Sequence, residues 1–341
     1  MPLSRTPGKR AKSSASGNSR APALARFFAI YNLFGLMSVA LRENSIDIAT
    51  ARTTACAKVN LTLEVLKRRG DGFHELRSLA VGVDLRDELR CAAHDEARVD
   101  LACSDRSLEG PHNLASRAAH ELAQQAGITP SLRIELRKSI PVGGGMGGGS
   151  SDAASALRLC NHLWQTGLEV AALAEVGARV GSDVPLFFFL PAAVMTGRGE
   201  CVQRVTMRWN GFVLLVFIGE PISTAAVYEE WRPADGAQLP AADIESVLSA
   251  RGAAELSAAL SNHLQPAVFR VCPRLKNTHE QLERAGFGPL TVSGAGSAMY
   301  GLFDDEDEAW RTACEIERQH PDLTTCVVGA PAGPGCIEKE Q

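Results

Sequence analysis

The alternation of apolar and polar residues divides the chain into strands and helices from about residue 53 onward. Residues 59–65 alternate with a period of two, which predicts a half-buried strand, and Asp71 with Gly72 predicts the turn that follows it. Alternation of this kind, or an unbroken apolar run, predicts further strands over residues 79–89, 97–103, 131–137, 184–190 and 211–219. Two short strands, residues 290–292 and 298–303, flank a glycine turn.

Helical periodicity dominates other segments. Helices are predicted over residues 113–126, 150–164, 169–180 and 306–320. In the second of these, apolar residues recur at spacings of four, three and four, and Gly181 is a plausible cap for the third. Residues 233–240 are rich in Pro, Ala and Gly and predict a loop. This order of elements favours an α+β fold over a regular alternation of strand and helix.

Composition narrows the class of protein. The chain has 341 residues, 45% of them hydrophobic and 22% charged, which is typical of a globular protein of two domains or one large one. A net charge of -4 gives no electrostatic reason to expect a nucleic-acid partner. Nine cysteines without a C-x-x-C spacing suggest reduced thiols rather than a zinc site or a disulfide framework. No apolar run reaches the length of a membrane helix, so small ligands are expected.

The first part of the chain differs from the rest. Residues 1–42 carry seven basic residues and no acidic one, with Ser and Pro early and an apolar patch later. This composition is compatible with a targeting peptide, but a tail or a start site at Met37 is favoured because no clear cleavage site follows. The predicted organisation is therefore a tail or targeting segment over residues 1–50, domains over 51–210 and 211–330, and a tail over 331–341. The expected compartment is the cytoplasm, or the plastid stroma if the segment is a transit peptide.

A glycine-rich segment between the strand 131–137 and the helix 150–164 is the most informative part of the sequence. Residues 143–149 contain six glycines, which let successive N–H groups face a ligand and let the backbone approach it closely. The helix that follows adds a positive dipole end, so the segment suits a polyphosphate better than a flexible linker. It lacks the G-K-[ST] ending of a P-loop. The candidate nucleotide-binding residues are Lys138, Pro141, Val142, Gly143, Gly144, Gly145, Met146, Gly147, Gly148, Gly149, Ser150 and Ser151.

Four motifs resemble those of the GHMP kinase superfamily, and among its members the 4-diphosphocytidyl-2-C-methyl-D-erythritol kinase family. Residues 141–154 resemble the glycine motif P-x-x-x-G-L-G-S/G-S-S-A/D-A, and residues 57–61 with 71–76 resemble A-K-x-N-L…D-G-Y-H-x-L. Residues 181–185 resemble G-A/S-D-V-P, and residues 293–297 resemble the C-terminal glycine motif. The resemblance covers about residues 53–328 and implies a two-domain fold with the active site in the cleft between the domains.

The sequence departs from the family pattern at three positions. Cys56 and Gly70 stand where the family usually has proline, and Phe73 replaces the usual tyrosine. An aromatic face is kept at Phe73, so stacking is expected to survive while a phenol hydrogen bond is lost. No charged catalytic position is affected.

Two charged residues are the candidate catalytic groups. Asp183 lies between a helix and an apolar run, where its carboxylate is either a turn cap or a group that takes the proton of an acceptor hydroxyl. Lys58 lies in a strand, either solvated at an edge or turned into a site where it would attract the acceptor oxygen and the γ-phosphate. Asn60 shares the strand face of Lys58. The resemblance favours the catalytic role for Asp183 and Lys58 and assigns Asn60 and Asp183 to the substrate.

The resemblance also assigns a nucleobase site. It implies that His74 and the aromatic Phe73 contact a cytosine, and that Tyr228 completes a sandwich around the pyrimidine, with Thr224 nearby. Without the resemblance, a lone histidine after a turn is more often a packed or surface residue. Lys138 is either a nucleotide contact or a solvated lysine at a strand end.

The resemblance implies an ATP- and Mg²⁺-dependent kinase that phosphorylates the 2-hydroxyl of 4-diphosphocytidyl-2-C-methyl-D-erythritol in the non-mevalonate isoprenoid pathway. No protein metal cage is expected, because Mg²⁺ would arrive with ATP. The partners expected are this small molecule, neither nucleic acid nor membrane, and a monomer or homodimer. The alternatives are a GHMP kinase for mevalonate or homoserine, and a non-catalytic binding protein of the same fold.

Overall fold

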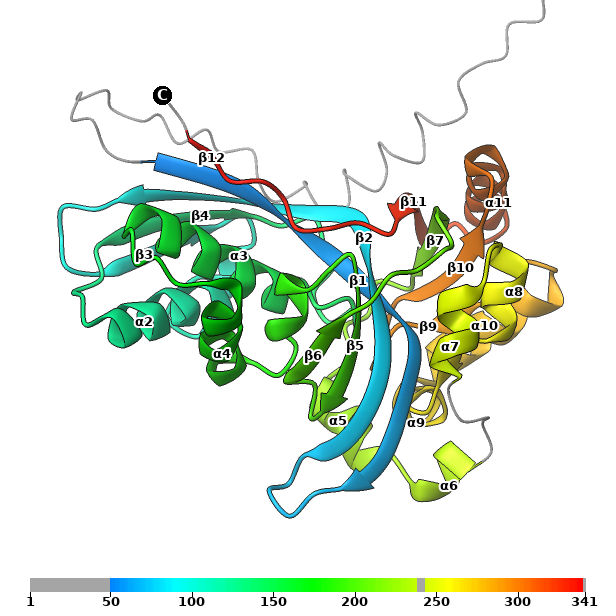
Figure 1. Ribbon diagram of the computed structural model, residues 1–341. Helices are drawn as coiled ribbons and strands as arrows, with labels where there is room; N and C mark the ends of the chain where they lie inside the picture. The colour runs from blue at the N-terminus through cyan, green and yellow to red at the C-terminus, as the bar shows by residue number, and fades with distance from the viewer. Residues whose placement is uncertain (1–49, 238–242, 340–341) are drawn as a thin grey trace, which may run out of the picture.

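A computed structural model describes residues 50–237 and 243–339, which form two β-sheets with helices around them (Figure 1). The first sheet is built on two long antiparallel strands, β1 and β2, which form a projecting hairpin. Its strands are β1 (Thr50–Arg68), β2 (His74–Ala93), β3 (Val99–Cys103), β4 (Leu132–Arg137), β5 (Ala192–Gly197), β6 (Cys201–Arg204), β8 (Ser261–Asn262) and β12 (Glu338–Lys339). The order is β12-β1-β2-β4-β3, with β5 also on β2, β6 on β5, and β8 parallel to β1.

Helices cover one side of this sheet and form its core. They are α2 (Leu114–Ala126), α3 (Gly148–Leu163), α4 (Val170–Val180) and the 3-10 turns η1 (Arg106–Leu108) and η2 (Pro185–Phe188). Their small apolar side chains, largely Ala, Leu and Val, pack against the sheet. The sequence sets the ends of α2, because the Asn113 side chain accepts from Ala115 N at 2.9 Å and Gly127 closes the helix with φ of 66°.

The second sheet has the order β11-β7-β10-β9. Its strands are β7 (Gly211–Phe217), β9 (Thr291–Val292), β10 (Met299–Phe303) and β11 (Thr324–Ala330). The helices of this half of the chain are α5 (Thr224–Glu230), α6 (Pro233–Ala237), α7 (Ile244–Ser249), α8 (Ala253–Ala258), α9 (Gln265–Val271), α10 (Pro273–Arg284) and α11 (Glu306–Gln319). Three acidic residues in the first turn of α11 match the positive end of its dipole.

A shared apolar core joins the two sheets and orients β1. Ala57, Val59 and Leu61 pack with side chains of β7, β10 and β11, and Tyr300 donates its hydroxyl proton to Asn60 O at 2.8 Å. Because strand side chains alternate, Lys58 and Asn60 then face the opposite way. The core therefore fixes which side chains of β1 are presented to the cleft.

Most predicted elements are confirmed, and two are wrong. Residues 184–190 were expected to form a buried strand, but the run folds as the 3-10 turn η2, with Pro185 at its start, because an apolar run without period does not distinguish the two structures. The loop expected over 233–240 begins with the helix α6, and residues 238–242 lie outside the described residues. Strands β5, β6, β8, β11 and β12 were not anticipated. The interpretation of residues 1–50 concerns residues that, apart from Thr50, are not described.

The domain limits stay a prediction, but the structure shows which parts of the chain belong to each of the two sheets. The second sheet starts at Gly211, and residues 335–339 return to the first sheet, where β12 pairs with β1. The predicted C-terminal tail therefore contributes a strand.

Candidate active site

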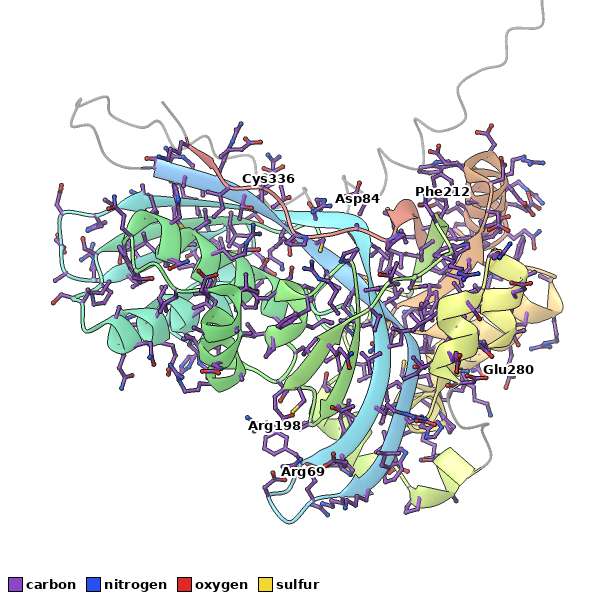
Figure 2. All side chains as sticks on the ribbon, in the orientation of Figure 1. Arg69, Asp84, Arg198, Phe212, Glu280 and Cys336 are labelled. Atoms are coloured by element: carbon purple, nitrogen blue, oxygen red, sulfur yellow. The ribbon has the colours of Figure 1, made fainter. Side chains whose placement is uncertain are left out.

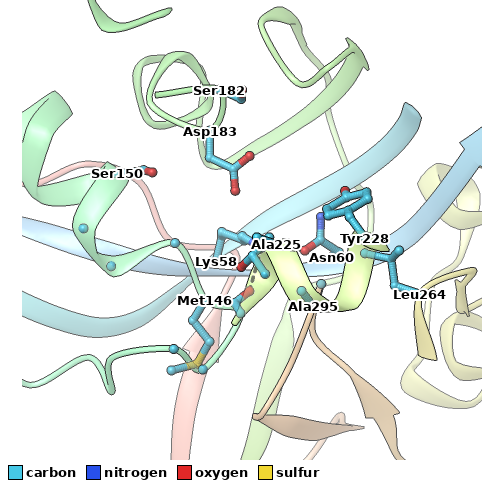
Figure 3. Close-up of a pocket in the computed structure, with 18 of the residues that line it drawn as sticks. Lys58, Asn60, Met146, Ser150, Ser182, Asp183, Ala225, Tyr228, Leu264 and Ala295 are labelled. Atoms are coloured by element: carbon cyan, nitrogen blue, oxygen red, sulfur yellow. Dashed lines mark hydrogen bonds between the residues drawn. The ribbon is translucent and has the colours of Figure 1, made fainter. Parts of the chain in front are cut away.

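One large cavity, of about 1320 Å³, opens between β1, the glycine-rich loop, the hairpin turn and α5. Figure 3 shows the carboxylate of Asp183 directed toward Lys58 from the opposite wall. The cavity brings together all but one of the site residues named from the sequence: Lys58, Asn60, Phe73, His74, Lys138, Pro141, Val142, Gly143, Gly144, Gly145, Met146, Gly147, Gly148, Gly149, Ser150, Asp183, Thr224 and Tyr228. Residues more than 150 positions apart thus meet at one site.

The glycine-rich loop is held against the C-terminal glycine turn, residues 293–298. Gly143, Gly145 and Gly147 have φ of 70–71°, a region that side chains disfavour. A Cβ at Gly145 would lie 2.0 Å from Ser293 O, so only glycine fits there. Carbonyl oxygens of the loop also accept from the turn, Gly143 O from Ser297 N at 3.0 Å and Gly144 O from Ala298 N at 3.1 Å. The loop's shape therefore depends on contacts made by the second half of the chain.

The loop ends at the N-terminus of α3, which is open to a ligand. The first backbone bond of the helix runs from Ser151 N to Gly147 O at 2.9 Å, which leaves the N–H groups of Gly148, Gly149 and Ser150 for another acceptor. The N-cap, Gly147, has no side chain to supply one. Such an end suits phosphate oxygens.

The expectation for Ser151 is corrected by the structure. Its hydroxyl is buried and donates to Cys56 O at 2.7 Å, and Ser151 does not line the cavity. Adjacent residues of a helix point in directions about 100° apart, so only one of two neighbouring serines can face the ligand side. Ser150 is the serine that does.

Lys58 is buried and tightly held at the base of the cavity. Its Nζ donates to Asn60 Oδ1 at 2.5 Å and to Gly145 O at 2.6 Å, and its backbone N–H donates to Met146 O at 3.0 Å. Asn60 is fixed in turn by donating from Nδ2 to Ser78 Oγ at 2.8 Å. The inward orientation expected for Lys58 is thus present, and its amine is held beside the loop.

Two opposing effects act on the pKa of the Lys58 amine. Burial lowers the pKa of the Lys58 amine from its usual range, and the Asp183 carboxylate raises it, so the net pKa is depressed. Burial also raises the pKa of the Tyr228 hydroxyl, and Asp183 adds to that effect. Asp183 is therefore close enough to influence both side chains that flank it.

Lys138 is committed to two carboxylates inside the protein. Its Nζ lies 2.7 Å from Asp152 Oδ2 and forms a second ion pair with Asp87, which is fully buried. Asp87 Oδ1 also accepts from the backbone N–H groups of Ser139 and Ile140, at 2.6 and 2.8 Å. The three side chains anchor the segment that leads from β4 into the glycine-rich loop. A direct nucleotide contact by Lys138 stays a prediction.

The pKa of the Asp152 carboxyl group is shifted upward. Burial raises its pKa to about 8, and the neighbouring Asp87 adds to this while Lys138 opposes it. Two carboxyl groups share one ammonium group, and their mutual repulsion favours the protonated form of Asp152. The Oδ1 atom of Asp152 is buried without a hydrogen-bond partner among the described residues.

Aromatic side chains line the other end of the cavity. His74 stacks on Tyr228, with ring centroids 5.2 Å apart and planes at 26°, and meets Trp231 edge-on at 5.4 Å and 77°. Phe73 is 47% exposed and lies under the Arg198 guanidinium, 4.8 Å from the ring centroid. Figure 2 shows Arg198 beside the β1–β2 hairpin. The ring that contacts Tyr228 in the structure is thus His74, and a sandwich between Phe73 and Tyr228 stays a prediction.

Several lining residues were missed by the sequence interpretation. Trp231 and Arg198 reach the site from elements whose position only the fold reveals, although Trp231 follows Tyr228 at helical spacing. The cavity extends to residues 107–114 near the start of α2, which carry no local motif.

Two general properties bear on the possible chemistry. Within residues 50–237 and 243–339, no group of three or more His, Cys, Asp or Glu side chains is arranged to hold a metal ion. Over the same ranges, none of the helices combines the length and apolar character needed to span a membrane.

The sequence is similar to two families and to many curated proteins. The family described as GHMP kinases N terminal domain matches residues 113–190, and the family described as GHMP kinases C terminal matches residues 243–322. The chain is 40% identical to the 4-diphosphocytidyl-2-C-methyl-D-erythritol kinase of Geobacter sp. (strain M21), with 77% of this chain and 93% of the relative covered. It is 38% identical to the protein of the same name from Kineococcus radiotolerans, with 80% and 87% covered.

Solved structures give the same result. A crystal structure of 4-(cytidine 5'-diphospho)-2C-methyl-D-erythritol kinase matches with a TM-score of 0.68 and 31% identity, covering 84% of this chain and 99% of the other. The homoserine kinase from Cytophaga hutchinsonii has a TM-score of 0.67 at 15% identity, covering 88% and 100%, which shows a shared fold alone.

Proposed function

The chain belongs to the 4-diphosphocytidyl-2-C-methyl-D-erythritol kinase family of the GHMP kinases, and on that basis we propose that it transfers the γ-phosphate of ATP to the 2-hydroxyl of 4-diphosphocytidyl-2-C-methyl-D-erythritol. This reaction belongs to the non-mevalonate route to isoprenoid precursors. The enzyme is a small-molecule kinase, as its relatives are.

The main support for the proposal is that one cavity contains both a candidate phosphate site and a candidate acceptor site. The open N-terminus of α3 and the glycine-rich loop supply donors for a polyphosphate. Lys58 is hydrogen-bonded to Gly145 O of that same loop, and Asp183 faces it. A γ-phosphate bound along the loop would therefore lie beside the groups needed for transfer to an alcohol.

The roles of the two charged groups follow from this placement. Asp183 orients the acceptor hydroxyl and takes its proton as the oxygen bonds to the γ-phosphorus and the bond to the leaving ADP oxygen breaks. Lys58 stabilises the negative charge on the transferred phosphoryl group, and Asp183 favours the protonated form that this role needs. Asn60 holds the Lys58 amine in position.

The remaining subsites are assigned by location. His74, Phe73, Tyr228 and Thr224 would receive the cytidine end of the substrate, since they line the same cavity and the rings of His74 and Tyr228 stack there. Mg²⁺ would arrive with ATP and be held mainly by phosphate oxygens and water. Its role would be to neutralise phosphate charge. A monomer or homodimer, and the cytoplasm or a plastid as the compartment, stay predictions.

A coupled ADP-release assay with a panel of alcohols tests the proposal. We expect turnover with the cytidylated substrate that exceeds turnover with mevalonate or homoserine by several orders of magnitude. Equal or greater turnover with either simpler alcohol would show that the aromatic end of the cavity does not select a nucleotide. ADP release from none of them, with ATP binding intact, would indicate the non-catalytic alternative.

A further inference from the structure

A second cavity, of about 920 Å³, lies outside the active site between three parts of the chain. Its walls are the C-terminal half of α3, the loop into α4 with the start of that helix, and the C-terminal strap, which is defined here as residues 334–339. Phe188 of η2 and Arg204 of β6 also line it. Figure 1 shows β12, at the end of this strap, beside the start of β1, and Figure 2 places Cys336 of the strap above the same strand. None of the residues assigned to catalysis or to either substrate lines this cavity.

The cavity is cationic, although the chain as a whole is acidic. Arg158, Arg204 and Lys339 line it, against Glu169 as the one carboxylate of its lining. Among the described residues none of the three cations has an ion-pair partner. By contrast, Glu338, next to Lys339, is paired with Arg52 at 2.8 Å. The cavity therefore keeps an excess of positive charge that the fold does not neutralise.

Arg158 is the most informative of these side chains. It is half-buried, and burial lowers the pKa of its guanidinium. One of its nitrogens, Nη1, donates to Gly335 O at 2.8 Å, which ties α3 to the C-terminal strap. A half-buried guanidinium has five donors, and a carbonyl neutralises none of its charge. Charges removed from water are normally paired, so the site favours an anion.

Two further features define the kind of anion. The N-terminus of α4, an eleven-residue helix, opens at this cavity, and its N-cap, Glu169, makes no side-chain capping bond. The rest of the wall is largely apolar and includes Leu163, Leu168 and Ile337. The volume exceeds that of a simple phosphate ion and suits a molecule with both a phosphate and an apolar part.

We propose that this cavity binds a small phosphorylated molecule with an apolar portion, its phosphate or diphosphate held by Arg158, Arg204 and Lys339. The cationic side chains would take the oxyanions, and the leucine and isoleucine side chains would cover the apolar portion. The site is separate from the ATP loop but lies at the other end of the same helix, α3, whose N-terminus borders that loop.

Calorimetric titration of the full chain tests the proposal, with 3-methylbutyl diphosphate and inorganic diphosphate as probes. The active site is first saturated with a non-hydrolysable ATP analogue and CDP, so that the probes cannot bind there, and Mg²⁺ is omitted from the titrant. We expect one 3-methylbutyl diphosphate per chain, weaker binding of inorganic diphosphate, and affinity that falls with added salt. If neither probe binds at millimolar concentration, the proposal is wrong.

Variants locate the binding. Arg158→Gln, which keeps a donor for Gly335 O, and Lys339→Gln, at an exposed position, should each weaken binding of both probes about ten-fold or more while the kinase activity stays unchanged. Leu168→Ser should remove the preference for 3-methylbutyl diphosphate alone. Arg117→Gln, on the exposed face of α2, is the matched control and should change nothing. Binding that Arg158→Gln and Lys339→Gln leave intact would show an adventitious ion site elsewhere. Equal affinity for the two probes would refute the apolar half of the proposal.

Discussion

The close approach of Gly145 to the C-terminal glycine turn makes a quantitative prediction. In Gly145→Ala the new Cβ would lie 2.0 Å from Ser293 O and 2.8 Å from Gly296 N, both backbone atoms that cannot rotate away. The alanine would also adopt φ of about 71°, the left-handed region. The two backbone segments must therefore separate, and Gly145 O, which accepts from Lys58 Nζ, moves with them.

The expected magnitude has a stability part and a catalytic part. The left-handed conformation costs about 1–2 kcal/mol, and relieving the overlap adds a similar amount, so we expect about 2–4 kcal/mol of lost stability. For a chain of this size that lowers Tm by about 3–6 °C. A displacement of about 1 Å at the base of the site typically costs about 100-fold in rate, so kcat should fall by that order.

A second glycine of the same loop is the control. At Gly149 a Cβ meets nothing closer than Leu114 Cδ1 at 3.6 Å, and φ is not left-handed. Gly149→Ala should therefore keep Tm near the wild-type value. Scanning calorimetry and a coupled ADP assay on both variants provide the test. If Gly145→Ala retains Tm within a degree and kcat within two-fold, the contact between the loop and the turn does not shape the site.

The other predictions concern single side chains in the cleft. Asp183→Asn should lower kcat by about 10²–10⁴ and leave the Kd of ATP nearly unchanged, and retention of a third of kcat would refute its role as base. Phe73→Ala should raise KM for the cytidylated substrate about ten-fold, with KM for ATP unchanged and Tm little changed because the side chain is 47% exposed; a lower Tm alone would indicate a packing role. Trp231→Leu should raise the same KM through loss of its contact with His74, and Trp231→Phe should restore it; equal defects would exclude an aromatic role. The pKa of Asp152 is about 8 in the folded protein, against an ordinary value of 3.8. The protonated side chain therefore contributes its full stabilisation of the fold below pH 3.8, and this contribution is lost as pH rises through about 8. Asp152→Asn should therefore flatten the decline in Tm over that range, and an unchanged pH profile would place the shared proton elsewhere.

The local patterns of the sequence predicted a large part of this structure. The glycine-rich loop stood out because its residues are adjacent and flanked by a clear strand and a clear helix. Alternation on β1 placed Lys58 and Asn60 on one face, and the structure shows their side chains joined. Such inferences succeed where the period of the pattern and the geometry of one element decide the answer.

What could not be predicted depends on contacts between distant segments. The three phenylalanines within 184–190 have no period, so the sequence did not distinguish a strand from the 3-10 turn that Pro185 begins. The burial of the Ser151 hydroxyl depends on where Cys56 O lies, 95 residues away. The pairing of Lys138 with Asp87 and Asp152 likewise requires the fold, because strand-end lysines are solvated by default.

The pairing of β12 with β1 has a consequence for how the protein is made. Arg52 meets its partner Glu338 across 286 positions, so a ribosome adding about 5–20 residues per second finishes the partner strand roughly 15–60 s after β1 has emerged. During that interval residues 51 and 52 of β1 lack the strand with which they pair, and until residues 293–298 are made the glycine-rich loop lacks the turn that shapes it. An unpaired strand edge is a site for association with other chains. The nascent chain therefore exposes this edge until residue 338 has been made, and the glycine-rich loop takes its final shape only after residues 293–298 have been made.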